Sequence, residues 1–61
     1  MIPQVGDTWS EVTPEGQVKG YYKIESVHKY FALATKLGKK RRAPQRIWLK
    51  HFGNRYVKTG T

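Results

Sequence analysis

The chain has 61 residues, of which 12 are Lys or Arg and 4 are Asp or Glu, so its formal net charge is +8. This length allows a single domain over residues 1–61 and excludes a second domain, a solenoid array or an elaborate active site. The sequence contains no cysteine, which excludes disulfide scaffolds, thiolate zinc sites and thiol nucleophiles.

Two strands joined by a tight turn are predicted in the first half of the chain. Residues 8–12 (TWSEV) form the first strand. Residues 13–16 (TPEG) form the turn, because proline presets φ at its second position and glycine suits its exit. Residues 17–28 then alternate as a second strand, and Val27 breaks the phase, which predicts a β-bulge near Glu25 and Ser26. The residues that share one face are Val18, Gly20, Tyr22 and Ile24.

A third strand is predicted over residues 29–37, followed by a tight turn at Gly38 and a fourth strand that begins near residues 41–42. Pro44 cannot donate a hydrogen bond to a β-ladder, so it indicates an edge strand or a bulge. One side of the third strand carries Phe31, Leu33, Thr35 and Leu37. The other side carries Tyr30, Ala32 and Ala34.

Residues 45–54 fit two structures. The alternation of Ile47 and Leu49 indicates a strand, whereas Trp48 and Phe52 also fit one face of a helical turn. We favour a strand that ends near Trp48, followed by one helical turn through Phe52. A single long helix across this segment would change the topology and would allow recognition of a nucleic-acid groove.

Residues 55–58 form a closing strand. Short strands separated by Gly and Pro turns are typical of a small all-β barrel. Closing the sheet into a barrel would remove exposed strand edges, which invite aggregation in so short a chain.

Five segments resemble small basic SH3-like barrel proteins that are common in phage and mobile-element genomes. The segments are VGDxW (5–9), YYKI (21–24), KKRR (39–42), IxLxxF (47–52) and RYV (55–57). The resemblance implies a five-stranded SH3-like barrel with one short helical turn before the last strand. It implies little about function, because SH3-like barrels bind DNA, RNA and peptides alike.

The distribution of charge is the most informative feature. Residues 1–25 hold all four acids and two bases, whereas residues 26–61 hold ten bases and no acid. A segment without carboxylates cannot neutralise its own charge, so an anionic partner would relieve its self-repulsion. The competing interpretation is that the excess charge only keeps a small protein soluble.

The sequence therefore predicts a nucleic-acid-binding protein that contacts the backbone and the shape of its ligand, with duplex DNA favoured over RNA. Lys and Arg would pair with phosphates and release counterions. Trp48 or Tyr21 would stack on a base or enter between base steps. The residues assigned to this site are Lys36, Lys39, Lys40, Arg41, Arg42, Arg46, Trp48, Lys50, Arg55, Lys58 and Tyr21.

Core packing competes with base stacking for every aromatic residue. Trp48 is left open between the two roles, because Ile47 and Leu49 would take the inward positions on either side of it. Tyr21 and Tyr22 point to opposite faces of one strand, and the phase predicts that Tyr21 is exposed. The residues assigned to the core are Trp9, Phe31 and Phe52.

We do not expect an enzyme or a bound cofactor or metal. His28 and His51 are isolated and flanked by bases, so they form neither an acid–base pair nor a zinc site. Phosphate-binding glycine motifs are absent from the sequence. The alternative function is that of a phage-type accessory module that binds an acidic host protein or peptide. The oligomeric state is left open.

The sequence also bears on location. It contains no run of roughly 18 apolar residues, and residues 1–7 lack the features of a secretory signal. We therefore expect a soluble, cytoplasmic protein that does not bind membranes. It would be associated with the nucleoid if it binds DNA, and it would act in the host cytoplasm if a phage encodes it.

Overall fold

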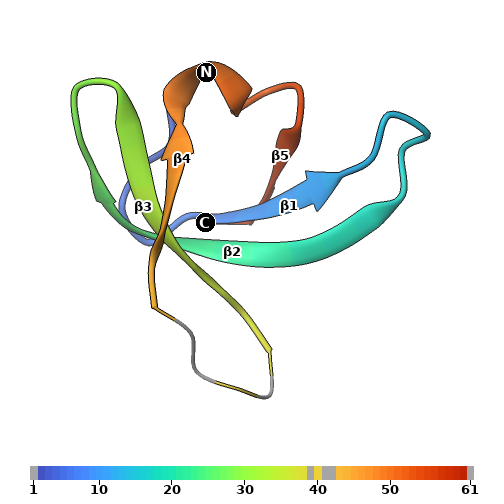
Figure 1. Ribbon diagram of the computed structural model, residues 1–61, viewed down its shortest axis with the longest axis horizontal. Coiled ribbons are helices and arrows are strands. Elements are labelled where there is room, and N and C mark those ends of the chain that lie inside the picture. The colour runs from blue at the N-terminus through green and yellow to red at the C-terminus, as the bar shows by residue number, and fades with distance from the viewer. Residues whose placement is uncertain (1, 39, 41–42, 61) are drawn as a thin grey trace.

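The computed structural model describes residues 2–38, 40 and 43–60 and shows an all-β chain (Figure 1). One 3₁₀ turn, η1, is the helical segment of this described part. The elements are β1 (Thr8–Val12), β2 (Val18–Val27), β3 (Phe31–Lys36), β4 (Gln45–Trp48), η1 (Leu49–His51) and β5 (Tyr56–Gly60).

The five strands form one antiparallel sheet in the order β4-β3-β2-β1-β5. Among the described residues β4 and β5 do not pair with each other, so the sheet has two open edges and is not a closed barrel. In Figure 1, β1 and β2 run across the middle of the molecule, while β3 and β4 cross the left end of β2. The long strand β2 belongs to both regions, since it pairs with β1 and with β3.

The predicted β-bulge in the second strand is confirmed. The register between β2 and β3 shifts between Ile24 and Ser26, which leaves Glu25 as the extra residue. A bulge bends its strand and increases the local twist. The bend lies just beyond the part of β2 that pairs with β1 and within the part that pairs with β3.

The segment before the last strand also follows the favoured interpretation. The fourth strand ends at Trp48, and the 3₁₀ turn Leu49–His51 follows it at once, so the alternative of one long helix is wrong. The strand begins at Gln45, later than predicted, and Arg41 and Arg42 lie outside the described residues. Pro44 immediately precedes this strand, and the strand is at the edge of the sheet. This agrees with the prediction, because proline has no amide proton to donate to a neighbouring strand.

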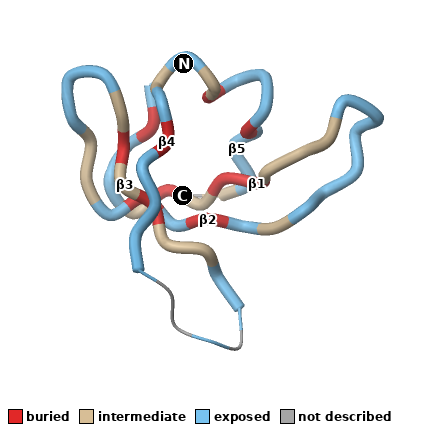
Figure 2. Tube along the Cα trace, in the orientation of Figure 1, coloured by how far each residue is buried: buried red, intermediate tan, exposed pale blue. Residues whose placement is uncertain are grey.

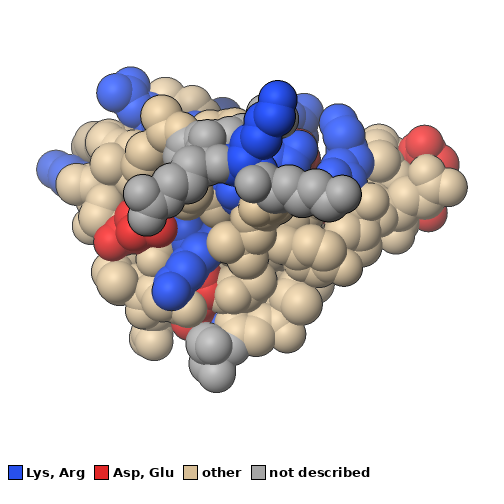
Figure 3. Space-filling view, turned by 90° about the horizontal axis from the view of Figure 1, so that it is seen from below, with Lys and Arg blue, Asp and Glu red and all other residues tan. Residues whose placement is uncertain are grey.

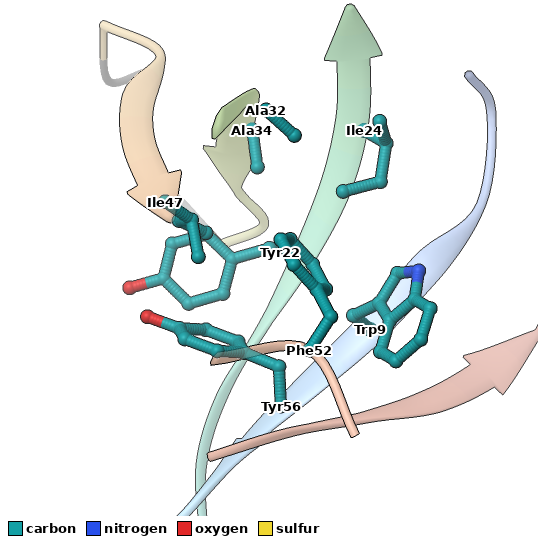
Figure 4. Packing of buried hydrophobic residues seen from close by; sticks show 8 residues of the cluster. All are labelled: Trp9, Tyr22, Ile24, Ala32, Ala34, Ile47, Phe52 and Tyr56. Atoms are coloured by element: carbon teal, nitrogen blue, oxygen red, sulfur yellow. The ribbon is translucent and has the colours of Figure 1, made fainter. Parts of the chain in front are cut away.

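The core lies on the inner side of the bent sheet and is built from large rings packed against small residues (Figure 2). Phe52, just after η1, packs edge-to-face on Trp9, with ring centroids 4.9 Å apart, and also contacts Tyr56. Figure 4 shows Phe52 between Trp9 and the two inward tyrosines. The buried cluster comprises Trp9, Tyr22, Ile24, Ala32, Ala34, Ile47, Phe52 and Tyr56.

The assignment of Trp9 and Phe52 to the core is confirmed, but the assignment of Phe31 is wrong. In β3 the fully buried residues are Ala32 and Ala34, so the intervening positions face outwards and Phe31 is only half-buried. The alanines are inward because Ala34 faces Ile24 across the ladder and Ala32 faces Ile47. The side chains of Ile24 and Ile47 fill the space on the inner side of the sheet opposite the two alanines.

Candidate nucleic-acid interface

The outer side of the β3–β4 pair carries two aromatic residues in register. Phe31 is paired with Trp48 across the ladder, and their rings meet edge-to-face with centroids 6.3 Å apart. Residues directly opposite each other in a ladder point to the same face of the sheet. Trp48 therefore lies outside the core, and 47% of its surface is exposed.

Tyr30 joins Trp48 at this end of the sheet. The backbone amide of Leu49 donates a hydrogen bond to the carbonyl oxygen of Tyr30 at 2.9 Å, which ties the β2–β3 turn to the start of η1. Tyr30 is 64% exposed. A shallow pocket of about 380 Å³ opens here, and its lining residues are Lys29, Tyr30, Trp48, Leu49 and Lys50.

Basic side chains lie against these rings. The guanidinium carbon of Arg46 is 4.7 Å from the centroid of Phe31, and Lys29 Nζ is 5.4 Å from the centroid of Tyr30. Cation–π contacts at exposed sites contribute about 0.5–1 kcal/mol each, so they orient the side chains without neutralising their charge. The imidazole of His28 stacks on Phe31 from the β2–β3 turn, with centroids 4.8 Å apart. We call the set Lys29, Tyr30, Phe31, Arg46, Trp48 and Lys50 the Trp48 surface.

A second group of cations lies at the other end of the β3–β4 pair. Figure 3 looks at the molecule from this end, and it shows Lys and Arg side chains near the centre of the view and acidic side chains towards its left and right margins. Lys40 is exposed there, and the stem of Lys36 crosses β2 at Gly20. A Cβ on Gly20 would lie 2.9 Å from Lys36 Cε, so glycine leaves room for this lysine. Lys39, Arg41 and Arg42 lie outside the described residues.

The remaining predicted contacts lie elsewhere. Lys58 Nζ is 3.9 Å from the buried carboxylate of Asp7. Arg55 lines a separate pocket of about 450 Å³, together with Glu11 and Lys19. Tyr21 is exposed as predicted, while its neighbour Tyr22 is buried, but Tyr21 faces Ser10 on the outer side of β2. The structure therefore places the described members of the predicted set in several separate groups instead of joining them into one surface.

The residues assigned to the site from the sequence leave out three residues of the Trp48 surface. Lys29 and Tyr30 belong to the β2–β3 turn, and their proximity to Trp48 arises from the β3–β4 pairing, which no local pattern reveals. Phe31 was assigned inwards on its hydrophobicity. The signal that bears on this choice is the alternation of β3, in which Ala32, Ala34 and Lys36 share one face while Phe31, Leu33 and Thr35 share the other.

The inner side of the sheet holds the group with the clearest change in acidity. Burial raises the pKa of the Tyr56 hydroxyl from 10.0 to about 12, and the nearby charge of Glu11 and the hydroxyl of Tyr22 act in the same direction. Tyr22 donates a hydrogen bond of 3.4 Å to Glu11 Oε1. These groups belong to the packing of the inner face. In the described part of the chain, no three His, Asp or Glu residues lie close enough together to hold a metal ion.

Comparison with known protein families, with curated proteins and with solved structures finds no match to this chain. Within residues 2–38, 40 and 43–60, no helix has the length and apolar character needed to cross a membrane.

Proposed function

We propose that this protein binds nucleic acid, with duplex DNA as the favoured ligand, through contacts to phosphates and to the shape of the duplex. One observation carries the proposal. Among the residues that the structure describes, Lys58 is the one Lys or Arg that forms an ion pair with a carboxylate. No described carboxylate forms an ion pair with the other described cations of residues 26–61, and a polyanion would neutralise their charge with release of counterions.

The β3–β4 pair gives these charges an extended arrangement. Lys36 and Lys40 lie at its loop end, Arg46 lies within β4, and Lys50 follows at the far end. The four residues of β4 span roughly 13 Å at the usual rise of a strand. Duplex DNA carries one charge per about 1.7 Å of its axis, so the pair could meet several phosphates at once. This arrangement suits backbone contacts, since no helix of the described chain could fill a major groove.

The proposal includes a finer statement about the fold. We infer that the open sheet corresponds to an SH3-like barrel whose two edge strands have not closed. Three features support this: five antiparallel strands, a long second strand bent at a bulge, and a 3₁₀ turn between β4 and β5.

One observation favours a second function, the binding of an acidic host protein by a phage-type accessory module. Exposed apolar side chains cross the outer side of the sheet at Val57, Tyr21 and Leu37. Val57 and Tyr21 both face Ser10 in the ladder, and the amide of Leu37 donates to the carbonyl of Tyr21 at 2.8 Å. Apolar groups on a charged surface are more typical of contacts between proteins than of phosphate contacts.

A salt titration tests the proposed function. Affinities for blunt duplex DNA, duplex RNA and polyglutamate would be measured between about 50 and about 200 mM salt. Six phosphate contacts predict a slope of about −5 for log affinity against log salt concentration on duplex DNA. Absence of DNA binding at the lowest salt, or tighter binding of polyglutamate than of DNA, would overturn the proposal in favour of an acidic partner.

A pair of double variants locates the contact. The combination of Arg46→Gln and Lys50→Gln should reduce the magnitude of the slope by about 2, because two phosphate contacts are lost. The control combines Lys19→Gln and Arg55→Gln, which removes the same charge from the pocket that contains Glu11. Equal losses in the two double variants would show that net charge alone governs binding, and would contradict a contact surface on β3 and β4.

A further inference from the structure

We propose that the pocket beside Trp48 takes one unpaired base of the bound nucleic acid. The inference rests on the proposed function and extends it, since it names the structural form of the nucleic acid that this protein prefers. A strand end, a flap or a single-stranded segment would supply such a base, whereas an intact blunt duplex would not.

The first argument is the position of the two rings. Tyr30 and Trp48 both contribute to the pocket, yet neither belongs to the core. The backbone of each residue is fixed, that of Trp48 by its pairing in the ladder and that of Tyr30 by the hydrogen bond from Leu49, and the ring of Trp48 also meets Phe31 edge-to-face. A fixed backbone limits the freedom that the two side chains lose when a base stacks on them, and stacking accepts any base because every base has a π-face.

The second argument is charge. Lys29 and Lys50 are both lining residues, and none of the described residues that line the pocket is acidic. A methylated lysine or another cationic ligand would be repelled, although aromatic pockets often bind such groups. A nucleotide fits instead, because its base can occupy the aromatic part while the adjacent phosphates reach the two lysines.

The third argument is shape. The pocket is shallow and lies where the edge strand β4 ends and η1 begins. A base inside a duplex is covered on both faces by its neighbours, so it must leave the stack before its face can meet Trp48. The energy of unstacking is smallest for a base that is already unpaired, which is why the pocket should select strand ends and single strands.

The experiment compares DNA probes that differ only in their bases. A blunt hairpin duplex would be extended by a short thymidine tail or by an abasic tail of equal length, so that the phosphates are the same. The thymidine tail should bind about 5- to 150-fold more tightly than the abasic tail, the range expected when one base stacks. Trp48→Ala should remove this difference, so that the two tails bind with equal affinity.

The matched control is Tyr21→Ala, which removes an aromatic residue of similar exposure, 45%, on another part of the outer side. It should leave the preference for the thymidine tail intact. Equal affinity for the two tails, or a preference that survives Trp48→Ala, would overturn the inference while the salt titration still supports phosphate binding. Failure of every probe to bind at the lowest salt would instead overturn the proposed function.

Fluorescence provides a second measurement that needs no variant. Trp9 is buried and Trp48 is half exposed, so acrylamide quenches the emission of Trp48 selectively. The thymidine tail should protect this emission from acrylamide, and the abasic tail should not. Unchanged quenching with saturating thymidine tail would contradict the inference, even if Trp48→Ala fails to fold.

Discussion

Ile47 and Trp48 are neighbours in β4 and point to opposite sides of the sheet, with 4% and 47% of their surfaces exposed. Ile47 faces Ala32 on the inner side, and Trp48 faces Phe31 on the outer side. One short edge strand therefore connects the core with the proposed binding surface, and the two roles can be separated by mutation.

Truncation of these two residues should have different consequences for stability. Ile47→Ala removes buried methyl groups and should lower the free energy of unfolding by about 2–5 kcal/mol, enough to unfold much of so small a domain. Trp48→Ala removes a half-exposed ring and should cost about 1 kcal/mol. Urea denaturation followed by circular dichroism measures both. Equal losses would show that Trp48 is part of the core.

Asp7→Asn tests the polar anchor of the N-terminal segment. The carboxylate of Asp7 is buried, accepts a hydrogen bond of 3.0 Å from the amide of Gln4, and pairs with Lys58. Loss of its charge should lower the free energy of unfolding by about 1–2 kcal/mol, because hydrogen bonds to charged groups are the stronger ones. Glu15→Gln in the exposed turn is the control and should have little effect. A loss in the control as large as that in Asp7→Asn would indicate a general effect of net charge.

Gly16 should be more sensitive to substitution than Gly38. Neither glycine has a neighbouring atom within 4 Å of an added Cβ, but Gly16 has a φ of 88°, in the left-handed region. Gly16→Ala should therefore cost about 1 kcal/mol from backbone strain alone. Gly38→Ala should be neutral or slightly stabilising, because alanine restricts the unfolded chain. A comparison of thermal midpoints decides the point, and similar midpoints would contradict a strained turn.

Tyr56 should make stability depend on pH in the alkaline range. Burial raises its pKa to about 12, so between pH 10 and 12 the unfolded chain loses this proton while the folded chain keeps it. The resulting stability is complete below pH 10 and disappears as the pH rises through about 12. Between these limits the wild type should lose more stability than Tyr56→Phe, as measured by urea midpoints. Parallel losses would show that other groups, such as the lysines, account for the change.

Local patterns were sufficient to predict most of the strands. Alternation separated Tyr21 from Tyr22 correctly and placed the bulge near Glu25, because both features depend on the period of a single strand. The orientation of β3 was a different problem. Alternation defines two faces, but the choice of the inner one depends on the residues that neighbouring strands bring opposite, here Ile24 and Ile47.

The candidate site could be predicted only in part for a similar reason. The excess of bases in residues 26–61 indicated an anionic partner, but it did not show which bases would meet. Asp7 pairs with Lys58 from the far end of the chain, and the β3–β4 pairing brings Lys29 to the pocket that Lys50 also lines. Such contacts depend on the topology of the sheet, which the order of charges along the sequence does not reveal.

The exposed end of the β1–β2 hairpin has a consequence for local motion. Residues 14–19 are all exposed, and Figure 2 shows this hairpin extending away from the buried segments at the right of the view. Regions with few buried contacts open at a small fraction of the free energy needed to unfold the whole domain. Amide protons near this tip should therefore exchange with deuterium quickly, whereas those of Tyr22 and Ile24 should exchange only on global unfolding. The part of the protein that unfolds cooperatively should therefore exclude the tip of the β1–β2 hairpin and be smaller than the whole sheet.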